Sequence, residues 1–204
     1  MPRIFDNIEQ KLLPALGETL DVAYRADFCV GYFNLRGWRL LDSRLDHWKG
    51  EGERCRLLIG MQSLPQDDLR EALSLVDAPS EIDNPAAVRL RKKVAAEFRA
   101  QLSMGLPTAA DEAGLRQLAD RIRSGRLCVK LALRKRLHAK LYLLFRHDPV
   151  NPVVGFLGSS NLSFAGLQAQ GELNVDVLDH DACAKLAKWF DDRWEDRFCL
   201  DISE

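Results

Sequence analysis

The order of strand-like and helix-like segments constrains the fold of this chain more than any other feature. Residues 28–33, FCVGYF, are a short run of strand-forming residues. In the segment that follows, Trp38, Leu41 and Leu45 recur at helical spacing. Residues 55–60, CRLLIG, then have the composition of a second strand. A strand, a helix and a strand in this order indicate a βαβ unit, which favours an α/β sheet.

Four further strands are predicted in the second half of the chain. They are residues 127–132, 138–145, 153–158 and 172–178, and the turn RHDPVNP joins the middle two as a hairpin. A last helix begins near Asp181. Between the two groups of strands, residues 65–123 carry apolar residues at helical spacing, and this stretch is long for one crossover. We therefore expect a helical insertion there.

Composition and charge are those of a globular protein. With 204 residues, of which 47% are hydrophobic and 29% charged, the chain is long enough for one substantial core, and we predict a single domain over residues 1–204. The net charge of −1 gives no general attraction to nucleic acids or membranes. The N-terminus, MPRIFDNIEQ, lacks the apolar core of a signal peptide. We expect a cytoplasmic protein without a membrane partner.

The cysteines and the C-terminus add two expectations. The five cysteines are odd in number and form no C-x-x-C pair, which indicates a reducing compartment and argues against structural zinc. The chain stops at DISE, where Asp201 is interpreted as the N-cap of a further helix. Because domains seldom end where a helix begins, we expect the sequence to be a piece of a longer protein.

Polar side chains lie at the ends of three predicted strands. His138 and Lys140 are two positions apart in a strand-like run, so they point to the same side of the sheet. The next strand ends in GSSN, residues 158–161, whose small residues let backbone N–H groups approach an anion. The last strand opens with Glu172 and Asn174 on one face. Imidazole, ammonium, hydroxyl, amide and carboxylate groups at one sheet edge are the equipment of a metal-free phosphodiester site.

These residues resemble a known motif. H-A-K at 138–140 followed by G-S-S-N at 158–161 is similar to the H-x-K and G-S-x-N elements of the phospholipase D superfamily, which includes phosphodiesterases, phosphatidyl transferases and nucleases. Residues 28–41 resemble the first strand and helix of its fold, a mixed β-sheet flanked by helices. The layout is also similar to the phospholipase D-like nuclease module that precedes helicase motors in some bacterial proteins. That likeness implies a helicase domain C-terminal to this chain.

The resemblance implies a role for each site residue. His138 is the nucleophile and Glu172 supports it, whereas Lys140, Asn161 and Ser159 or Ser160 hold the phosphoryl oxygens. Since one H-x-K motif is half of the usual site, the resemblance implies a homodimer with a shared site, and it implies no metal ion and no cofactor. One departure concerns Phe145, because the family motif has an aspartate five positions after the lysine.

A basic run before the motif bears on the substrate. From Arg121 to His147 there are nine Lys or Arg and no Asp or Glu, and we expect Arg134 and Arg136 to contact the substrate. Such a run suits nucleic acid, although a solvated surface is the ordinary alternative. The leading prediction is therefore a metal-independent nuclease that cleaves DNA through a phosphohistidine.

Two alternatives stay open. A catalytically degenerate module that binds DNA and dimerises within a helicase is favoured by the loss of the motif aspartate at Phe145. A phospholipid phosphodiesterase would share the chemistry, but the sequence shows no amphipathic segment through which a lipid would enter.

Overall fold

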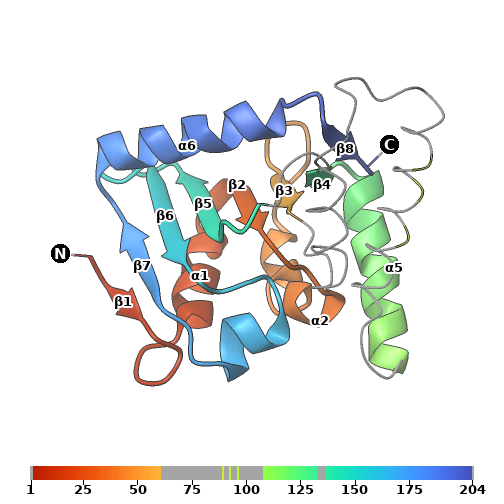
Figure 1. The fold of residues 1–204 in the computed structure, drawn as a ribbon, viewed down its shortest axis with the longest axis horizontal. Helices are drawn as coiled ribbons and strands as arrows, with labels where there is room; N and C mark the ends of the chain where they lie inside the picture. The colour runs from red at the N-terminus through yellow and green to blue at the C-terminus, as the bar shows by residue number, and fades with distance from the viewer. Residues whose placement is uncertain are drawn as a thin grey trace, which may run out of the picture.

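The computed structural model describes residues 2–60, 89, 92, 96, 108–132 and 137–203 (Figure 1). The strands, in chain order, are β1 Ile4–Phe5, β2 Ala23–Val30, β3 Cys55–Ile59, β4 Leu127–Ala132, β5 Leu141–Arg146, β6 Val153–Gly158, β7 Asn174–Val177 and β8 Cys199–Asp201. The helices are α1 Leu12–Asp21, α2 Leu35–Trp38, α5 Ala109–Arg123 and α6 His180–Trp194, with a 3-10 turn η1 Asp42–Leu45 and a π-helical turn η2 Ala165–Ala169.

All eight strands form one mixed sheet in the order β1-β7-β6-β5-β2-β3-β4-β8. Strands β2, β3 and β4 run parallel, as the βαβ pattern predicts. Strands β5, β6 and β7 form an antiparallel meander that joins the parallel part through the pair β2 and β5. As a consequence, the end of β2, the start of β5, the end of β6 and the start of β7 lie side by side, and we call the side of the sheet formed by these strand ends the edge that carries the site.

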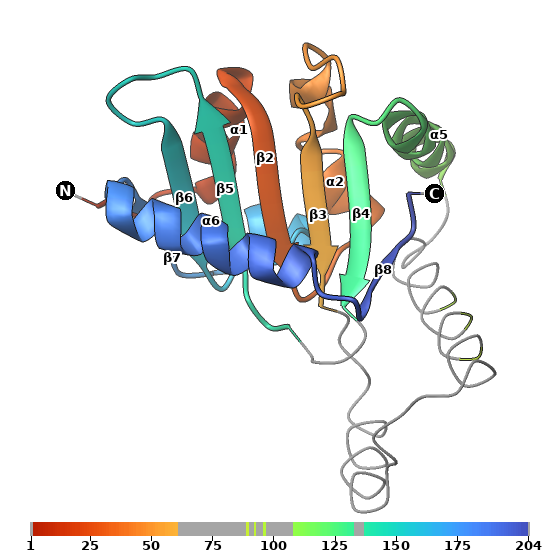
Figure 2. The same cartoon turned by 90° about the horizontal axis from the view of Figure 1, so that it is seen from above.

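Helices cover both faces of the sheet. Figure 2 shows α6 across one face, with α1 and α2 behind the other. Alternate residues of β5 separate accordingly: Tyr142 and Leu144 enter the larger core under α1 and α2, whereas Leu141 and Leu143 enter a smaller core under α6 with Phe190. The short central strands are therefore apolar on both faces, which explains their continuous hydrophobic runs.

Local sequence explains where the elements near the site begin and end. Asn34 caps α2, since its Oδ1 accepts a 2.9 Å hydrogen bond from the Gly37 N–H. The hairpin between β5 and β6 turns at Asp148, whose Oδ1 accepts from the N–H groups of Val150 and Asn151. At the start of α6, Asp179 accepts from the N–H of Ala182.

Four expectations change. The first strand, predicted over 28–33, is observed over Ala23–Val30. The strand predicted over 138–145 is observed over Leu141–Arg146, and the strand predicted over 172–178 is observed over Asn174–Val177. His138, Lys140 and Glu172 therefore precede their strands. Asp201 ends β8, which pairs with β4, and does not cap a helix. Pairing to a strand some seventy positions away overrides the local capping signal.

The helical insertion is described only in part. Its end is α5, which begins with the capping box of Thr108 and Asp111. Apart from residues 89, 92 and 96, the stretch 65–107 lies outside the described residues. Within the described part of the chain, no helix has the length and apolar character needed to cross a membrane.

Candidate active site

The site lies at the sheet edge where β2 ends and β5 begins. Cys29 of β2 pairs with Leu141 of β5, so Lys140 directly precedes this pair and Gly31 lies two residues beyond it. On the other side of β5, Leu157 of β6 pairs with Leu141, which brings the GSSN turn to the same edge. The sheet register thus gathers segments that are far apart in the sequence.

His138 and Lys140 lie in an extended segment that crosses a glycine. The space above Gly60 is filled by Leu137, whose carbonyl oxygen is 1.9 Å from the position that a Cβ at Gly60 would occupy. Lys140 Nζ donates a 2.7 Å hydrogen bond to the carbonyl oxygen of His138, which closes the segment on itself. The His138 side chain is exposed and Lys140 is half-buried. Glycine at position 60 is therefore what lets this segment pass over the end of β3.

Lys140 and Asn161 converge over Gly31. A Cβ at Gly31 would lie 3.6 Å from Lys140 Nζ and 3.5 Å from Asn161 Oδ1. Asn161 Oδ1 accepts a 2.9 Å hydrogen bond from the backbone N–H of Tyr32, which ties the turn after β6 to the end of β2. The Lys140 ammonium and the Asn161 carboxamide thus lie close together beside Gly31, where the Leu137 carbonyl oxygen is also 3.3 Å from the same Cβ position. A cation and an amide side by side are groups that can hold phosphoryl oxygens.

The two serines of the GSSN turn have different surroundings. Ser160 is fully buried and exchanges two hydrogen bonds with Asn174: Asn174 Nδ2 donates to Ser160 Oγ at 2.8 Å, and the Ser160 N–H donates to Asn174 Oδ1 at 3.2 Å. Ser159 is exposed, and its Oγ accepts from the Leu173 N–H at 2.9 Å. Ser160 therefore holds the turn against β7, whereas Ser159 lies at the surface.

Glu172 lies close to this turn but is not hydrogen-bonded to His138. Tyr142 donates a 2.8 Å hydrogen bond to the Ser160 carbonyl, and its pKa is raised above its usual range, first by burial and then by the nearby negative charge of Glu172. Within the described part of the chain, no hydrogen bond joins Glu172 to His138. The predicted support of His138 by Glu172 is therefore not formed in this conformation.

The predicted basic run is divided between different environments. Arg134 and Arg136 lie outside the described residues. Arg121 is buried and paired with Asp42. Lys130 donates to the Trp194 carbonyl and lies 4.8 Å from the Trp194 ring centroid. These two members of the run therefore have partners within the fold.

The other histidines have structural partners. His47 contacts the Ala23 carbonyl, His147 stacks on Tyr24, and His180 contacts the Val150 carbonyl. A cysteine nucleophile at this edge is disfavoured as well, because burial raises the pKa of Cys29 to about 12 and keeps the thiol protonated at neutral pH. Among the histidines of the chain, His138 is the one at the convergence of Lys140 and Asn161.

Sequence reasoning missed three residues that build the site. Gly31 and Gly60 give space to Lys140 and to the His138 segment, and Tyr32 positions Asn161. The two glycines directly follow the apolar runs of β2 and β3, which is the one signal that marks them. The sequence pattern places Asn174 on the same face of the last predicted strand as Glu172, but it predicts no role for Asn174. Over the described residues, no group of three or more His, Cys, Asp or Glu side chains is arranged to hold a metal ion.

Comparison with known structures gives the fold. Nuc from Salmonella typhimurium, a phospholipase D family member, is 12% identical with a TM-score of 0.52, covering 98% of this chain and 97% of that protein. NucT from Helicobacter pylori is 13% identical with a TM-score of 0.50 and 99% coverage of both chains. Phosphatidylserine synthase from Haemophilus influenzae is 15% identical with a TM-score of 0.54, covering all of this chain but 39% of the synthase.

Sequence comparison gives the family. A search of curated proteins gave no significant match. The family model described as cardiolipin synthase, PLD-like domain, matches residues 20–194, which include His138, Lys140, the GSSN turn and Glu172. Because that match spans most of the chain and the fold agrees, the chain belongs to the phospholipase D superfamily as a PLD-like domain.

Proposed function

We propose that this protein is a phosphodiesterase that cleaves DNA through a phosphohistidine intermediate, in a site that two copies of the chain share. The observation that carries the proposal is the convergence of Lys140 and Asn161 over Gly31, directly beside the exposed His138. A cation and an amide side by side suit the oxygens of a phosphoryl group, and an exposed imidazole suits attack on its phosphorus.

The reaction requires a second histidine. An imidazole nitrogen of His138 attacks phosphorus, the bond to the leaving oxygen breaks, and that oxygen takes a proton from the partner subunit's His138. Water then attacks the phosphohistidine while the partner's His138 removes its proton, and the nitrogen–phosphorus bond breaks. Lys140 and Asn161 stabilise the negative charge that gathers on the phosphoryl oxygens in both steps.

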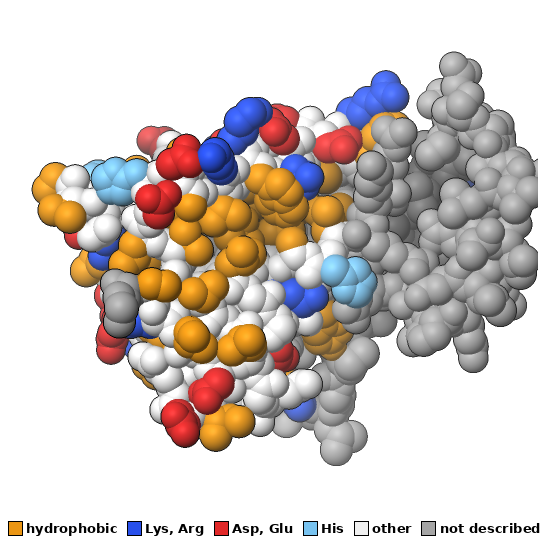
Figure 3. Space-filling view, turned by 60° about the vertical axis from the view of Figure 1, so that its left-hand side comes forward, with side chains coloured by type: hydrophobic (Ala, Val, Ile, Leu, Met, Phe, Trp, Pro, Cys, Tyr) orange, Lys and Arg blue, Asp and Glu red, His pale blue; other side chains and the backbone are white. Residues whose placement is uncertain are grey.

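An apolar surface beside the site supports the shared arrangement. Ile4, Leu157 and Leu173 are 60%, 38% and 64% exposed, and we call these three residues the apolar edge face. Ile4 and Leu157 both pair with Val175, and Leu157 also pairs with Leu141 at the site. Figure 3 shows hydrophobic side chains gathered on the side of the molecule where β1, β7 and β6 lie. Burial of this face against a second copy would bring the two sites together.

The comparisons bear on the substrate. The similar structures include Nuc and NucT, whose names denote nucleases, and a phosphatidylserine synthase, so phospholipid is the second candidate. Nucleic acid is favoured because a pocket lined by Arg36 and Arg39 lies near the GSSN turn. Attachment to a helicase domain remains a prediction.

Cleavage assays in EDTA test the proposal. Labelled single- and double-stranded DNA, and vesicles of phosphatidylglycerol, are incubated with the wild type, with His138→Asn and with the control His147→Asn, which changes a histidine in the hairpin region. We expect the wild type and the control to cleave DNA and His138→Asn to bind DNA without cleaving it. Equal binding without cleavage by all three would identify a degenerate binding module. Turnover of the vesicles alone would identify a lipid enzyme.

A further inference from the structure

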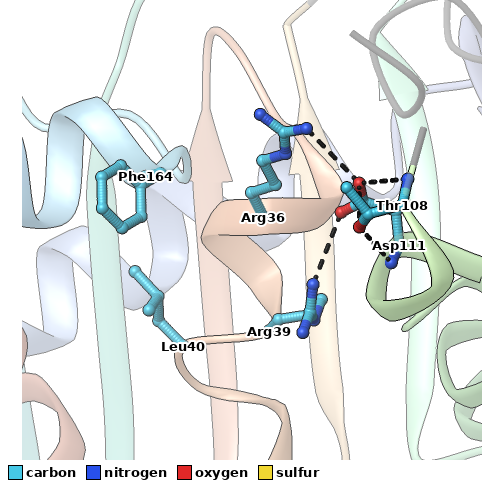
Figure 4. Close-up of a pocket in the computed structure, with 6 residues that line it drawn as sticks. All are labelled: Arg36, Arg39, Leu40, Thr108, Asp111 and Phe164. Atoms are coloured by element: carbon cyan, nitrogen blue, oxygen red, sulfur yellow. Dashed lines mark hydrogen bonds and ion pairs between the residues drawn. The ribbon is translucent and has the colours of Figure 1, made fainter. Parts of the chain in front are cut away.

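A pocket of about 380 Å³ lies between α2, η2 and the start of α5. It is lined by Arg36, Arg39, Leu40, Thr108, Asp111 and Phe164 (Figure 4). The volume falls within the range of small-ligand sites, roughly 300 to 1,000 Å³. None of these residues belongs to the H-x-K or G-S-x-N elements, so the motif does not explain the pocket.

The pocket has one apolar wall and one cationic wall. Phe164, which is 46% exposed, and Leu40 lie together on one side in Figure 4, and Arg36 and Arg39 lie on the other. An exposed aromatic ring beside guanidinium groups is the arrangement on which a nucleobase stacks while its phosphate pairs with arginine. The pocket therefore offers an apolar wall for a nucleobase and a cationic wall for a phosphate.

Asp111 is the one acid among the described residues that line the pocket. It is anionic at neutral pH, because hydrogen bonding to Thr108 and then to Arg36 holds its pKa below the usual range. It contacts Arg36 Nη2 at 3.3 Å and Arg39 Nη1 at 3.4 Å, distances longer than those of a strong charge-assisted hydrogen bond, roughly 2.7–2.9 Å. Because these contacts are long, a phosphate can compete with Asp111 for the two guanidinium groups.

The pocket is joined rigidly to the active site. Phe164 follows Asn161 by three residues, a span of at most about 11 Å. The Asn34 N–H donates a 3.1 Å hydrogen bond to the Leu162 carbonyl, so the start of α2 is tied to the same turn. At about 3.4 Å of rise per nucleotide of a duplex strand, a few nucleotides cover that span.

We propose that this pocket binds a nucleotide flanking the scissile phosphate, with its base on Phe164 and Leu40 and its phosphate on Arg36 and Arg39. The proposal rests on the proposed function, because it assigns the pocket to the same nucleic-acid substrate. It goes further by naming the residues outside the family motif that distinguish a nucleic acid from a small phosphodiester.

Competition between two substrates tests the proposal. The catalytic efficiencies for a single-stranded DNA oligonucleotide and for bis-para-nitrophenyl phosphate, a diester that carries no nucleobase and no second phosphate, are measured for the wild type, Phe164→Leu and Arg39→Gln. We expect each substitution to lower the ratio of oligonucleotide to small-diester kcat/KM by about 10-fold or more, the loss of one base–aromatic stack or one phosphate contact. Phe164→Trp should restore the ratio. Arg116→Gln, on the exposed surface of α5, is the matched control and should leave it at the wild-type value.

Binding measurements separate this proposal from the proposed function. Anisotropy of the labelled oligonucleotide is followed in the His138→Asn background, where cleavage plays no part. Phe164→Leu should weaken binding about 10-fold, and Asp111→Asn should tighten it about fivefold, because it removes a unit charge some 4 Å from the phosphate. If DNA is not cleaved but these shifts appear, the catalytic proposal fails and the pocket stands. Unchanged affinity in both variants, or a response only to phosphatidylglycerol vesicles, would overturn the pocket proposal.

Discussion

The carboxamide oxygen of Asn161 accepts a 2.9 Å hydrogen bond from the backbone N–H of Tyr32. Because a backbone N–H only donates, the bond fixes which end of the carboxamide is the oxygen and therefore where Nδ2 lies. Among the described residues, nothing accepts a hydrogen bond from Nδ2. In the proposed function, the two N–H donors of Asn161 Nδ2 would be available to a phosphoryl oxygen.

Replacement of Asn161 by aspartate separates position from charge. Asn161→Asp keeps the acceptor for Tyr32 but replaces the two donors with a negative oxygen, and we expect DNA cleavage to fall by about 100- to 1,000-fold, the usual effect of losing one donor to a developing anion. The melting temperature should stay close to that of the wild type. Gln170→Glu, on the exposed surface nearby, adds the same charge outside the site. If that control lost as much activity, the role of the Asn161 amide would be refuted.

Glycine at position 60 should be indispensable for the His138 segment. A Cβ there would lie 1.9 Å from the Leu137 carbonyl oxygen, so Gly60→Ala must displace the backbone that carries His138. We expect both the melting temperature and the cleavage rate to fall. In Gly52→Ala the added methyl group meets nothing within 4 Å, and thermal melting and activity should be unchanged. Full activity of Gly60→Ala would show that the segment is not fixed as described.

Restoration of the family aspartate should not increase activity. Phe145 is five residues beyond Lys140 along β5, about 16 Å at the usual rise, and its ring lies 4.2 Å from the guanidinium carbon of Arg25. Phe145→Asp removes an apolar contact and should lower the free energy of unfolding by about 1–3 kcal/mol, whereas Phe145→Leu should cost less. Denaturant unfolding measures the first effect. A rise in cleavage rate per folded molecule would show that the aspartate matters for chemistry in this chain.

The apolar edge face should control the oligomeric state. Leu157→Arg and Leu173→Arg place a charge on that face, and we expect light scattering after gel filtration to show a monomer that has lost DNA cleavage. Val150→Arg adds the same charge at a residue that is 69% exposed in the hairpin, and it should leave a dimer. A wild type that is a strict monomer at the concentration where it cleaves DNA would rule out the shared site.

A buried ion network under α6 should dominate the stability of the parallel strands. Asp27, which is fully buried, accepts from Arg56 Nε at 2.6 Å and from Arg25 Nη2 at 2.6 Å. Burial lowers the pKa of Arg56, but the hydrogen bonds and charges of Asp27 and Asp191 outweigh it, so the pKa stays above its usual value.

Asp27→Asn removes the buried negative charge that these guanidinium groups share, although its amide oxygen can still accept hydrogen bonds. It should lower the free energy of unfolding by about 3–5 kcal/mol. Asp191→Asn removes the half-exposed partner of Arg56 and should cost about 1 kcal/mol or less. Urea titration of both variants measures the difference, and equal losses would contradict the assignment.

Residue type and spacing are enough to predict the class of fold and to identify the motif. The strands at 127–132 and 153–158 were predicted with their observed bounds, because short apolar runs between turn residues leave few alternatives. His138, Lys140 and the GSSN turn were found from residue type and spacing, and the family match confirms the superfamily. The sequence does not predict which serine of the GSSN turn is buried, because the burial of Ser160 and the exposure of Ser159 depend on packing against β7.

The way in which the site is built depends on contacts between segments that are far apart in the sequence. Asp201 lies in a strand that pairs with β4, although its local sequence is that of a helix cap. His138 and Lys140 lie before β5, in a segment that passes over Gly60. Gly31, Gly60 and Tyr32 contribute through contacts with residues about 80 to 130 positions away, which local propensity does not encode. The physical reason is that sequence patterns report local periodicity and burial, whereas the close approach of separate segments is set by the register of the sheet.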